Sequence, residues 1–329
     1  MKKIYKNPKQ VTKNCILVDS VGKAQYYEKV EILLSHGKKY TGHVAEIQGS
    51  QVVINVHGSL EGVSWQDIQI KFLETEEKIK VSSDMIGHIG NALFQPLENY
   101  PAFIPEQKIS LHSLPLPESE RIKTADILLT GDGTNESFSS VYKGEYETLF
   151  WEKEIFDFSL LFHFWEKIKN QSPASLILIG TFGILPEEAK FMIEECEKRS
   201  LISSSIVALH KTSDTAGSAL FLPHRCLSIA EYFAFQKQKD VIVILWNVEY
   251  YEKIYEAIQT SSSSSFFQEI ISLSDRTGCQ KNGGSITLLN FYSLSSETKE
   301  SFQDLMLNFP GKKKKIPNDL FSSLPKLPI

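Results

Sequence analysis

The residues best placed to do chemistry follow the apolar run at 241–245, where the sequence continues Trp246-Asn247. Such a run predicts a buried strand, and in nucleotide hydrolases the end of such a strand supplies a carboxylate that holds Mg²⁺ beside the phosphates. Asn247 has no charge to offer a metal ion. The stretch therefore predicts either a hydrolase site that has lost its chemistry or a buried strand that never had any.

A phosphate-binding loop would be the second part of such a site. It needs glycines, which let backbone N–H groups surround the phosphates, and a lysine for charge, in the pattern G-x-x-x-x-G-K-[ST]. The sequence has no such segment, and the junction in the corresponding place, residues 148–161, reads TLFWEKEIFDFSLL without a glycine. Its carboxylates would repel a polyphosphate. The degenerate phosphate-loop position comprises Trp151, Glu152, Lys153, Glu154, Ile155, Phe156 and Asp157.

Other groupings of reactive side chains point to no site. The eight histidines and four cysteines show neither metal-ligand spacing nor a C-x-x-C pair, which predicts no metal centre and no disulfide framework. No Ser/His/Asp or Cys/His arrangement stands out. Glycines at 131, 133, 283 and 284 are typical of hairpin turns. The four lysines at 312–315 indicate a solvated linker rather than a contact for phosphate or acidic lipid.

Composition narrows the class of partner. The 329-residue chain carries a net charge of −5, so no global basic field favours nucleic acid. No apolar run approaches the roughly 20 residues that cross a bilayer, and the first residues lack the apolar segment of a signal peptide. We therefore expect a cytoplasmic protein that meets a membrane only indirectly, through a partner.

Two patterns of hydrophobicity divide the chain into three parts. Short runs of period two, at 15–18, 30–34, 40–47, 52–56 and 68–72, predict a small β-barrel over residues 1–80. Residues 81–120 are rich in proline and predict an irregular connection, especially over 84–117. Buried-strand runs then alternate with helices through 121–329: strands at 176–179, 206–209, 241–245 and 285–290, helices at 186–199, 223–238, 250–259 and near 266–274. This alternation predicts an α/β domain with a mainly parallel sheet.

Several segments, in one order along the chain, resemble a known family. They are VSSDMIGHIGN at 81–91, GILPEEAKFM at 183–192, LSIAEYFAF at 227–235, NGGSIT at 282–287 and IPNDLFSSLPKL at 316–327. Together they are similar to the non-catalytic B subunit of V-type (V/A-type) rotary ATPases and ATP synthases. The resemblance implies a RecA-like, P-loop-type α/β domain of degenerate nucleotide-binding type. It also implies a C-terminal helical domain, which we expect to be missing because the sequence stops at Ile329.

The resemblance also assigns roles to individual positions. In that family the glycine loop of the B subunit is already degenerate, because hydrolysis belongs to the A subunit. Here the loop position has diverged further, and Asn247 stands at the magnesium-carboxylate position. Lys326 stands where an arginine reaches across the subunit boundary to the neighbour's γ-phosphate. Lysine keeps the charge but lacks the planar two-pronged donor geometry of arginine.

The sequence thus leads to an expected function with two alternatives. We expect a non-catalytic structural or regulatory subunit, paired with an A subunit in a hetero-oligomeric ring that couples ATP synthesis or hydrolysis to proton or sodium transport. No cofactor is expected on this chain, and ATP or ADP with Mg²⁺ would lie only at an interface with the A subunit. One alternative is a degenerate B-subunit paralogue that serves as a protein-binding scaffold outside the motor, and the other is an active ATPase.

Overall fold

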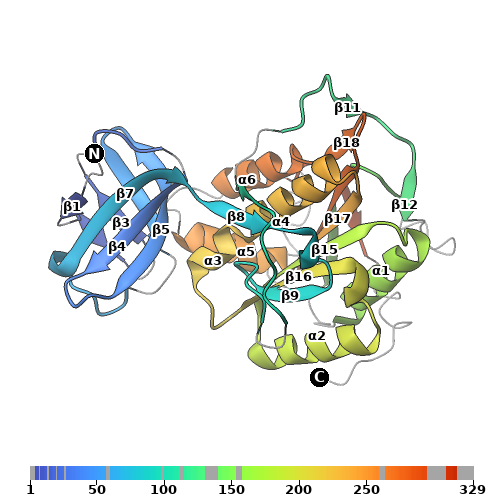
Figure 1. Cartoon of the computed structure of the whole chain (residues 1–329), viewed down its shortest axis with the longest axis horizontal. Helices are drawn as coiled ribbons and strands as arrows, with labels where there is room; N and C mark the ends of the chain where they lie inside the picture. The colour runs from blue at the N-terminus through green and yellow to red at the C-terminus, as the bar shows by residue number, and fades with distance from the viewer. Residues whose placement is uncertain are drawn as a thin grey trace.

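The computed structural model contains two lobes joined by an extended connection (Figure 1). The smaller lobe is formed by the N-terminal strands, and the larger lobe contains all of the α-helices drawn. The residues that the structure describes are 4–6, 8–12, 15–19, 21–25, 27–56, 60–97, 100–111, 115–129, 140–152, 158–258, 264–294 and 309–316.

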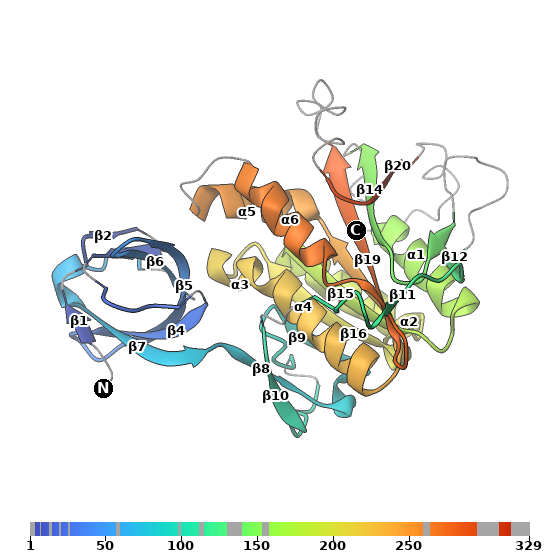
Figure 2. The same cartoon turned by 90° about the horizontal axis from the view of Figure 1, so that it is seen from above.

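The smaller lobe is a seven-stranded antiparallel sheet that curls on itself (Figure 2). Its strand order is β1-β7-β4-β5-β6-β3-β2. Burial alternates along β4, since successive side chains of a strand point to opposite faces, and the buried face lines the core. The predicted β-barrel is confirmed as this curled sheet. Its strands are β1 (Ile4–Lys6), β2 (Gln10–Val11), β3 (Cys15–Val18), β4 (Glu28–Leu34), β5 (Lys39–Gln48), β6 (Gln51–Val56) and β7 (Ile68–Glu76), with a 3-10 turn η1 (Trp65–Asp67) before β7.

The connection is more ordered than the prolines indicate. β8 (Lys78–Val81) and β10 (Gln107–Ser110) pair as a two-stranded antiparallel ribbon, with a 3-10 turn η2 (Ser83–Met85) between them in sequence. β9 (His88–Asn91) joins the large sheet beside β16. The prediction that 84–117 is irregular is therefore wrong at β9 and β10. Four-residue strands are too short to show a period, so only their distant partners define them.

A parallel sheet forms the centre of the larger lobe. Its parallel strands follow the order β20-β14-β19-β17-β15-β16-β9, and the short antiparallel strands β11 and β18 extend from the start of β19. The remaining strands are β11 (Arg121–Ile122), β12 (Ile127–Leu129), β13 (Val141–Tyr142), β14 (Tyr146–Glu152), β15 (Leu176–Ile184), β16 (Ser205–Lys211), β17 (Asp240–Trp246), β18 (Gly278–Gln280), β19 (Ser285–Leu294) and β20 (Lys312–Lys315).

Helices cover both faces of this sheet (Figure 2). On β15, Leu176 and Leu178 belong to the core under α4, α5 and α6, whereas Ile177 and Ile179 belong to the core under α1 and α2. This double burial is the physical reason for continuous apolar runs, and it confirms the predicted α/β class. The helices are α1 (Phe158–Gln171), α2 (Pro186–Lys198), α3 (Ala216–Leu220), α4 (Leu222–Glu231), α5 (Val248–Ile258) and α6 (Ser264–Ser274), with a 3-10 turn η3 (Ile202–Ser204) and a π-helical turn η4 (Tyr232–Gln236).

The lysine run at 312–315 is an edge strand and not a solvated linker, so that prediction is wrong. β20 pairs in parallel with β14. The Nζ atom of Lys314 lies 2.6 Å from Oε2 of Glu147, and both side chains are buried. Burial raises the pKa of Glu147, against the opposing effect of Lys314. Composition cannot anticipate such an ion pair, because Glu147 lies far away in sequence.

The larger lobe also contacts the smaller lobe and the start of the connection. His43 of β5 packs edge-on against Phe221, with ring centroids 3.7 Å apart. Buried Arg225 of α4 lies 3.0 Å from a carboxylate oxygen of Glu77, which stands between β7 and β8. These contacts join the curled sheet to the helical face of the larger lobe. No helix in the described ranges has the length and apolar character needed to span a membrane.

Candidate functional site

The carboxyl ends of the parallel strands are where a ligand would be expected in an open α/β sheet. β14, β19, β17 and β15 run in the same direction, so Glu152, Leu294, Trp246 and Ile184 end at a common edge. This edge brings together the described parts of the two predicted sites, the phosphate-loop position and the magnesium-carboxylate position. Their surroundings determine what chemistry the edge can do.

At the phosphate-loop position the indole of Trp151 is buried in the protein. Trp151 is 1% exposed, and Glu152 is the last residue of β14, opposite Leu294. The remaining residues of that prediction, Lys153, Glu154, Ile155, Phe156 and Asp157, lie outside the described residues. Trp151 therefore exposes almost no surface to which a phosphate could bind.

Aromatic rings fill the space between the sheet and α1. The rings of Trp151 and Trp246 stack with centroids 4.9 Å apart and an interplanar angle of 22°. The ring centroid of Phe291 lies 5.2 Å from that of Trp246, in a tilted arrangement. The ring of Phe158 stacks on Trp246 with centroids 6.3 Å apart. The first four residues of α1, 158–161, are all buried. A helix N-terminus binds an anion when its N–H groups face the ligand; here the first turn is packed into an apolar core.

Asn247 has a structural task at the end of β17. Its φ of 69° is left-handed, a conformation that asparagine adopts more readily than most residues. Its Nδ2 donates to the backbone oxygen of Phe182 at 2.7 Å, and its own backbone oxygen accepts from Tyr250 N at 3.0 Å. The carbonyl of Phe182 can only accept, which assigns the amide orientation. Asn247 thus ties β15 to β17 and starts α5, and an aspartate could not make the first bond.

A small cavity of about 210 Å³ opens beside Asn247. Its lining includes the carboxylates of Glu188 and Glu249 and the ammonium group of Lys253. Glu188 accepts from Leu185 N at 2.7 Å, and burial raises the pKa of its carboxyl. Glu249 accepts from the backbone N of Ser293 at 3.2 Å. Two carboxylates against one lysine oppose phosphate binding, and the described residues contain no cluster of three or more metal-ligating side chains.

The backbone around this cavity is tightly constrained. Gly183 has a φ of 59°, and a Cβ atom there would lie 2.4 Å from the Tyr250 ring. Gly183 N donates to Nδ1 of His210 at 3.3 Å, and Nε2 of His210 lies 3.2 Å from the oxygen of Thr215. These bonds require the ring proton on Nε2, and burial lowers the pKa of His210. The histidine therefore supports the edge as a neutral hydrogen-bonding residue.

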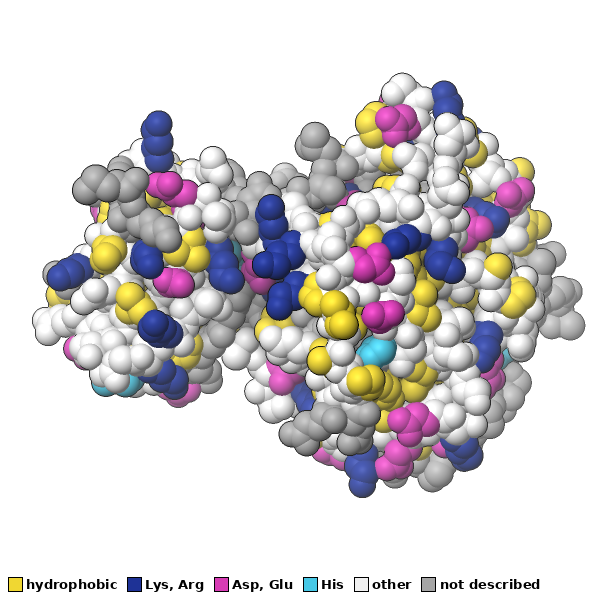
Figure 3. All heavy atoms as spheres, in the orientation of Figure 1, with side chains coloured by type: hydrophobic (Ala, Val, Ile, Leu, Met, Phe, Trp, Pro, Cys, Tyr) yellow, Lys and Arg dark blue, Asp and Glu magenta, His cyan; other side chains and the backbone are white. Residues whose placement is uncertain are grey.

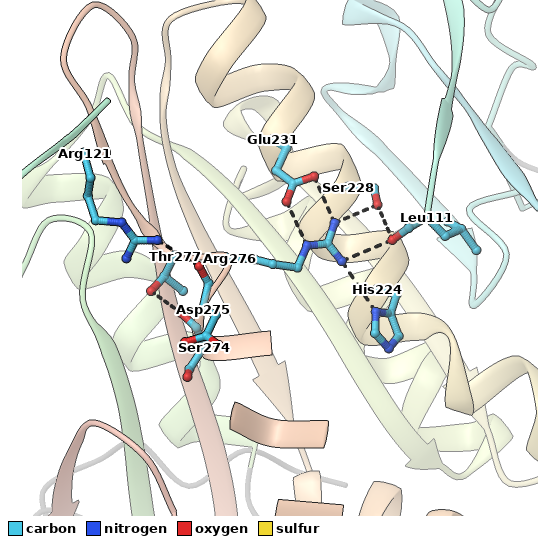
Figure 4. Close-up of polar contacts among 9 residues, drawn as sticks. All are labelled: Leu111, Arg121, His224, Ser228, Glu231, Ser274, Asp275, Arg276 and Thr277. Atoms are coloured by element: carbon cyan, nitrogen blue, oxygen red, sulfur yellow. Dashed lines mark hydrogen bonds and ion pairs between the residues drawn. The ribbon is translucent and has the colours of Figure 1, made fainter. Parts of the chain in front are cut away.

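A buried polar network that the sequence did not reveal links α4 to Arg276, in the turn after α6 (Figure 4). Arg276, 4% exposed, binds both carboxylate oxygens of Glu231, at 2.8 and 2.9 Å. It also donates to Ser228 Oγ at 2.9 Å and to the oxygen of Leu111 at 3.2 Å. The arginine thereby joins the connection to α4 and to the turn after α6. Only the fold brings these positions together, so no local motif could have found them.

His224 extends the network to two more helices. Its Nδ1 lies 3.5 Å from Nη1 of Arg276, which can only donate, so the ring proton is on Nε2. Nε2 lies 2.6 Å from Oε1 of Glu269, which also accepts from the hydroxyl of Tyr251 at 3.2 Å. Burial acts to raise the pKa of Glu269, but the contacts with His224, Tyr251 and Arg276 outweigh it and hold that pKa below its ordinary value. Every one of these groups has a partner within the fold, which is the character of a structural network.

A comparison with protein families covers the same part of the chain. Residues 136–306 match the model of the ATP synthase alpha/beta family, nucleotide-binding domain. The chain belongs to the ATP synthase alpha/beta family. The match runs from just before β13 to beyond β19, and so includes the carboxyl edge with Trp151 and Asn247.

Membership in this family gives a coarser identity than the resemblance found in the sequence. It supports a rotary ATPase subunit, and the family implies assembly with other subunits in a hetero-oligomeric ATPase complex. The family includes both catalytic and non-catalytic subunits. The position of Lys326, the predicted arginine-finger counterpart, lies outside the described residues.

Proposed function

We propose that the chain is a non-catalytic, structural or regulatory subunit of a V-type rotary ATPase or ATP synthase, equivalent to the B subunit. In this proposal it binds no nucleotide at its own sheet edge. The observation that supports the proposal is that residues at both predicted degenerate positions, the phosphate-loop position and the magnesium-carboxylate position, stabilise the fold. Trp151 stacks on Trp246 in the core, and the amide of Asn247 holds the carbonyl of Phe182.

Electrostatics support the same proposal. A magnesium–triphosphate needs cationic and N–H donors at the phosphates and a carboxylate at the metal. The described edge offers a neutral amide at the end of β17 and a cavity in which two carboxylates outnumber one lysine. A site for a triphosphate would require a surplus of cationic donors, which these residues do not supply. Catalysis would then belong to an A subunit, with nucleotide held at the interface and Lys326 contributed by this chain.

The direct test is assembly with a V-type A subunit. Purified chain and A subunit would be mixed with and without Mg–ATP and separated by size exclusion, with the A subunit alone as reference. We expect a stable complex that hydrolyses ATP. Failure to associate under any nucleotide condition would remove the chain from a V-type ring and favour the scaffold alternative.

Lys326 provides a second, independent test within the assembled complex. We expect Lys326→Ala to lower ATP turnover and Lys326→Arg to raise it, because the guanidinium can bind two phosphate oxygens at once. Both variants should leave the amount of complex unchanged. Equal turnover in all three assembled complexes would exclude Lys326 from the interface site.

A further inference from the structure

The ribbon formed by β8 and β10 has an unusual charge pattern. Lys80 pairs directly with Lys108, and Lys78 lies two residues along β8 on the same face. All three are exposed, whereas Ile79 and Val81 of the other face are buried. Like charges directly opposite each other destabilise a sheet. Among the described residues, none of the three lysines has a carboxylate within ion-pair distance.

A cavity of about 560 Å³ adjoins this basic face. Lys78 and Lys80 line it from β8, and Lys29 and Thr41 line it from the small lobe. Arg225 also lines it, but its charge is paired with Glu77. Figure 3 shows Lys and Arg side chains gathered at the waist between the lobes. The cavity therefore has a surplus of positive charge at its rim.

Part of the cavity lining is apolar. Phe94 and Phe103 line it together with prolines of the connection. Ile104, beside Phe103, is 80% exposed, the most exposed of the large apolar side chains in the described chain. An occupant must therefore offer anionic groups and apolar groups close together. Phosphate or a simple dicarboxylate would pair with the lysines but would leave the apolar lining without a contact.

We propose that the basic ribbon and this cavity form a docking site for an acidic polypeptide segment that also carries apolar side chains. Carboxylates would lie on Lys78, Lys80 and Lys108, and an apolar side chain would enter between Phe94 and Phe103. The cavity takes lining residues from the small lobe and from the connection. The net charge of −5 repels nucleic acid over the rest of the surface. This inference does not depend on ring membership.

The experiment is a fluorescence anisotropy titration of the full chain with a labelled peptide of alternating glutamate and leucine. The matched probes are its glutamine analogue, an oligothymidine strand and vesicles containing phosphatidylserine. We expect saturable binding of the glutamate peptide alone, weakened as salt rises from about 0.15 to about 1 M, where the screening length falls from about 8 to about 3 Å. Tighter binding of oligothymidine or of the vesicles would overturn the proposal.

Two sets of variants separate charge from shape. The triple variant Lys78→Gln/Lys80→Gln/Lys108→Gln should lose at least about tenfold in affinity, as expected when three ion pairs are removed. A charge-matched control, Lys123→Gln/Lys239→Gln/Lys281→Gln, changes exposed lysines elsewhere and should bind as the native chain does. The first triple variant should also unfold at the same or a higher temperature, because it relieves like-charge repulsion. Equal loss of affinity in both triple variants would overturn the proposal.

The apolar wall has its own variant. Ala102 lines the cavity and is exposed, so Ala102→Trp should narrow it without removing a charge. We expect this variant to bind the glutamate–leucine peptide more weakly, and to bind a peptide of glutamate and glycine as the native chain does. Unchanged binding of the glutamate–leucine peptide would show that the cavity takes no part.

Discussion

At the scale of single residues, Asn247 is a position that the sequence singled out and to which the structure gives a definite role. The sequence identified it by what it lacks, a negative charge. The structure adds what Asn247 supplies: its backbone adopts the left-handed conformation, and its side chain donates an N–H to the carbonyl of Phe182. An aspartate would place a carboxylate against that carbonyl oxygen. The asparagine is thus a stabilising residue in its own right.

Restoring the aspartate therefore has a clear expected cost. We predict that Asn247→Asp lowers the free energy of unfolding by about 1–3 kcal/mol at neutral pH, since the buried carbonyl of Phe182 loses its donor and faces a carboxylate instead. It should confer no ATP hydrolysis. Urea denaturation and a phosphate-release assay measure the two effects. Asn247→Gly is the control, because glycine adopts the same φ without adding a charge; it should lose less stability than the aspartate variant.

At the scale of elements, β20 is held to the sheet by charge as well as by its ladder. Lys314 covers Glu147, which is fully buried and whose pKa is raised by that burial. A carboxyl with a raised folded-state pKa contributes stability below the ordinary glutamate range, and that contribution is lost as pH rises through the raised pKa. At neutral pH the lysine offsets this loss. Lys314 therefore contributes most to the free energy of unfolding at pH values where Glu147 is ionised.

This argument predicts a pH-dependent mutant. Lys314→Met should destabilise the chain by about 3–5 kcal/mol at neutral pH, because it leaves a buried charge unpaired. The deficit relative to the native chain should shrink as pH falls and Glu147 takes up a proton. Urea denaturation at about pH 7 and about pH 4.5 measures it. The double variant Lys314→Met/Glu147→Gln should show little of this pH dependence, and a deficit equal at both pH values would contradict the account.

The Arg276 network is the second element-scale device. Arg276 lies in the turn after α6 and binds Leu111 of the segment that joins the lobes and Glu231 of α4. We predict that Arg276→Met destabilises the chain by about 3–5 kcal/mol, and that adding Glu231→Met recovers much of the loss because no unpaired carboxylate remains. Arg121→Met is the control. Arg121 is half-buried and donates, among the described residues, to the backbone oxygens of Leu116 and Asp275 and to no carboxylate, so its loss should cost less.

At the scale of the whole molecule, the architecture was largely predictable and its long-range contacts were not. Runs of period two indicate a strand buried on one face, and continuous apolar runs indicate a strand buried on both faces. The sequence therefore predicted the type of sheet in each lobe. The stack of Trp151 on Trp246, the pairing of β20 with β14 and the Arg276 network all depend on tertiary proximity. The missing glycines predicted a degenerate phosphate-loop position, but only the fold reveals that the indole of Trp151 stacks on Trp246 in the core.

At the same scale, the central proposal is that this family member takes part in assembly and leaves nucleotide chemistry to a partner. Isothermal titration of the isolated chain with Mg–ATP tests it most directly, with a V-type A subunit as the positive control. We predict no saturable heat at the concentrations that saturate the control. Stoichiometric binding with a micromolar Kd would contradict the account.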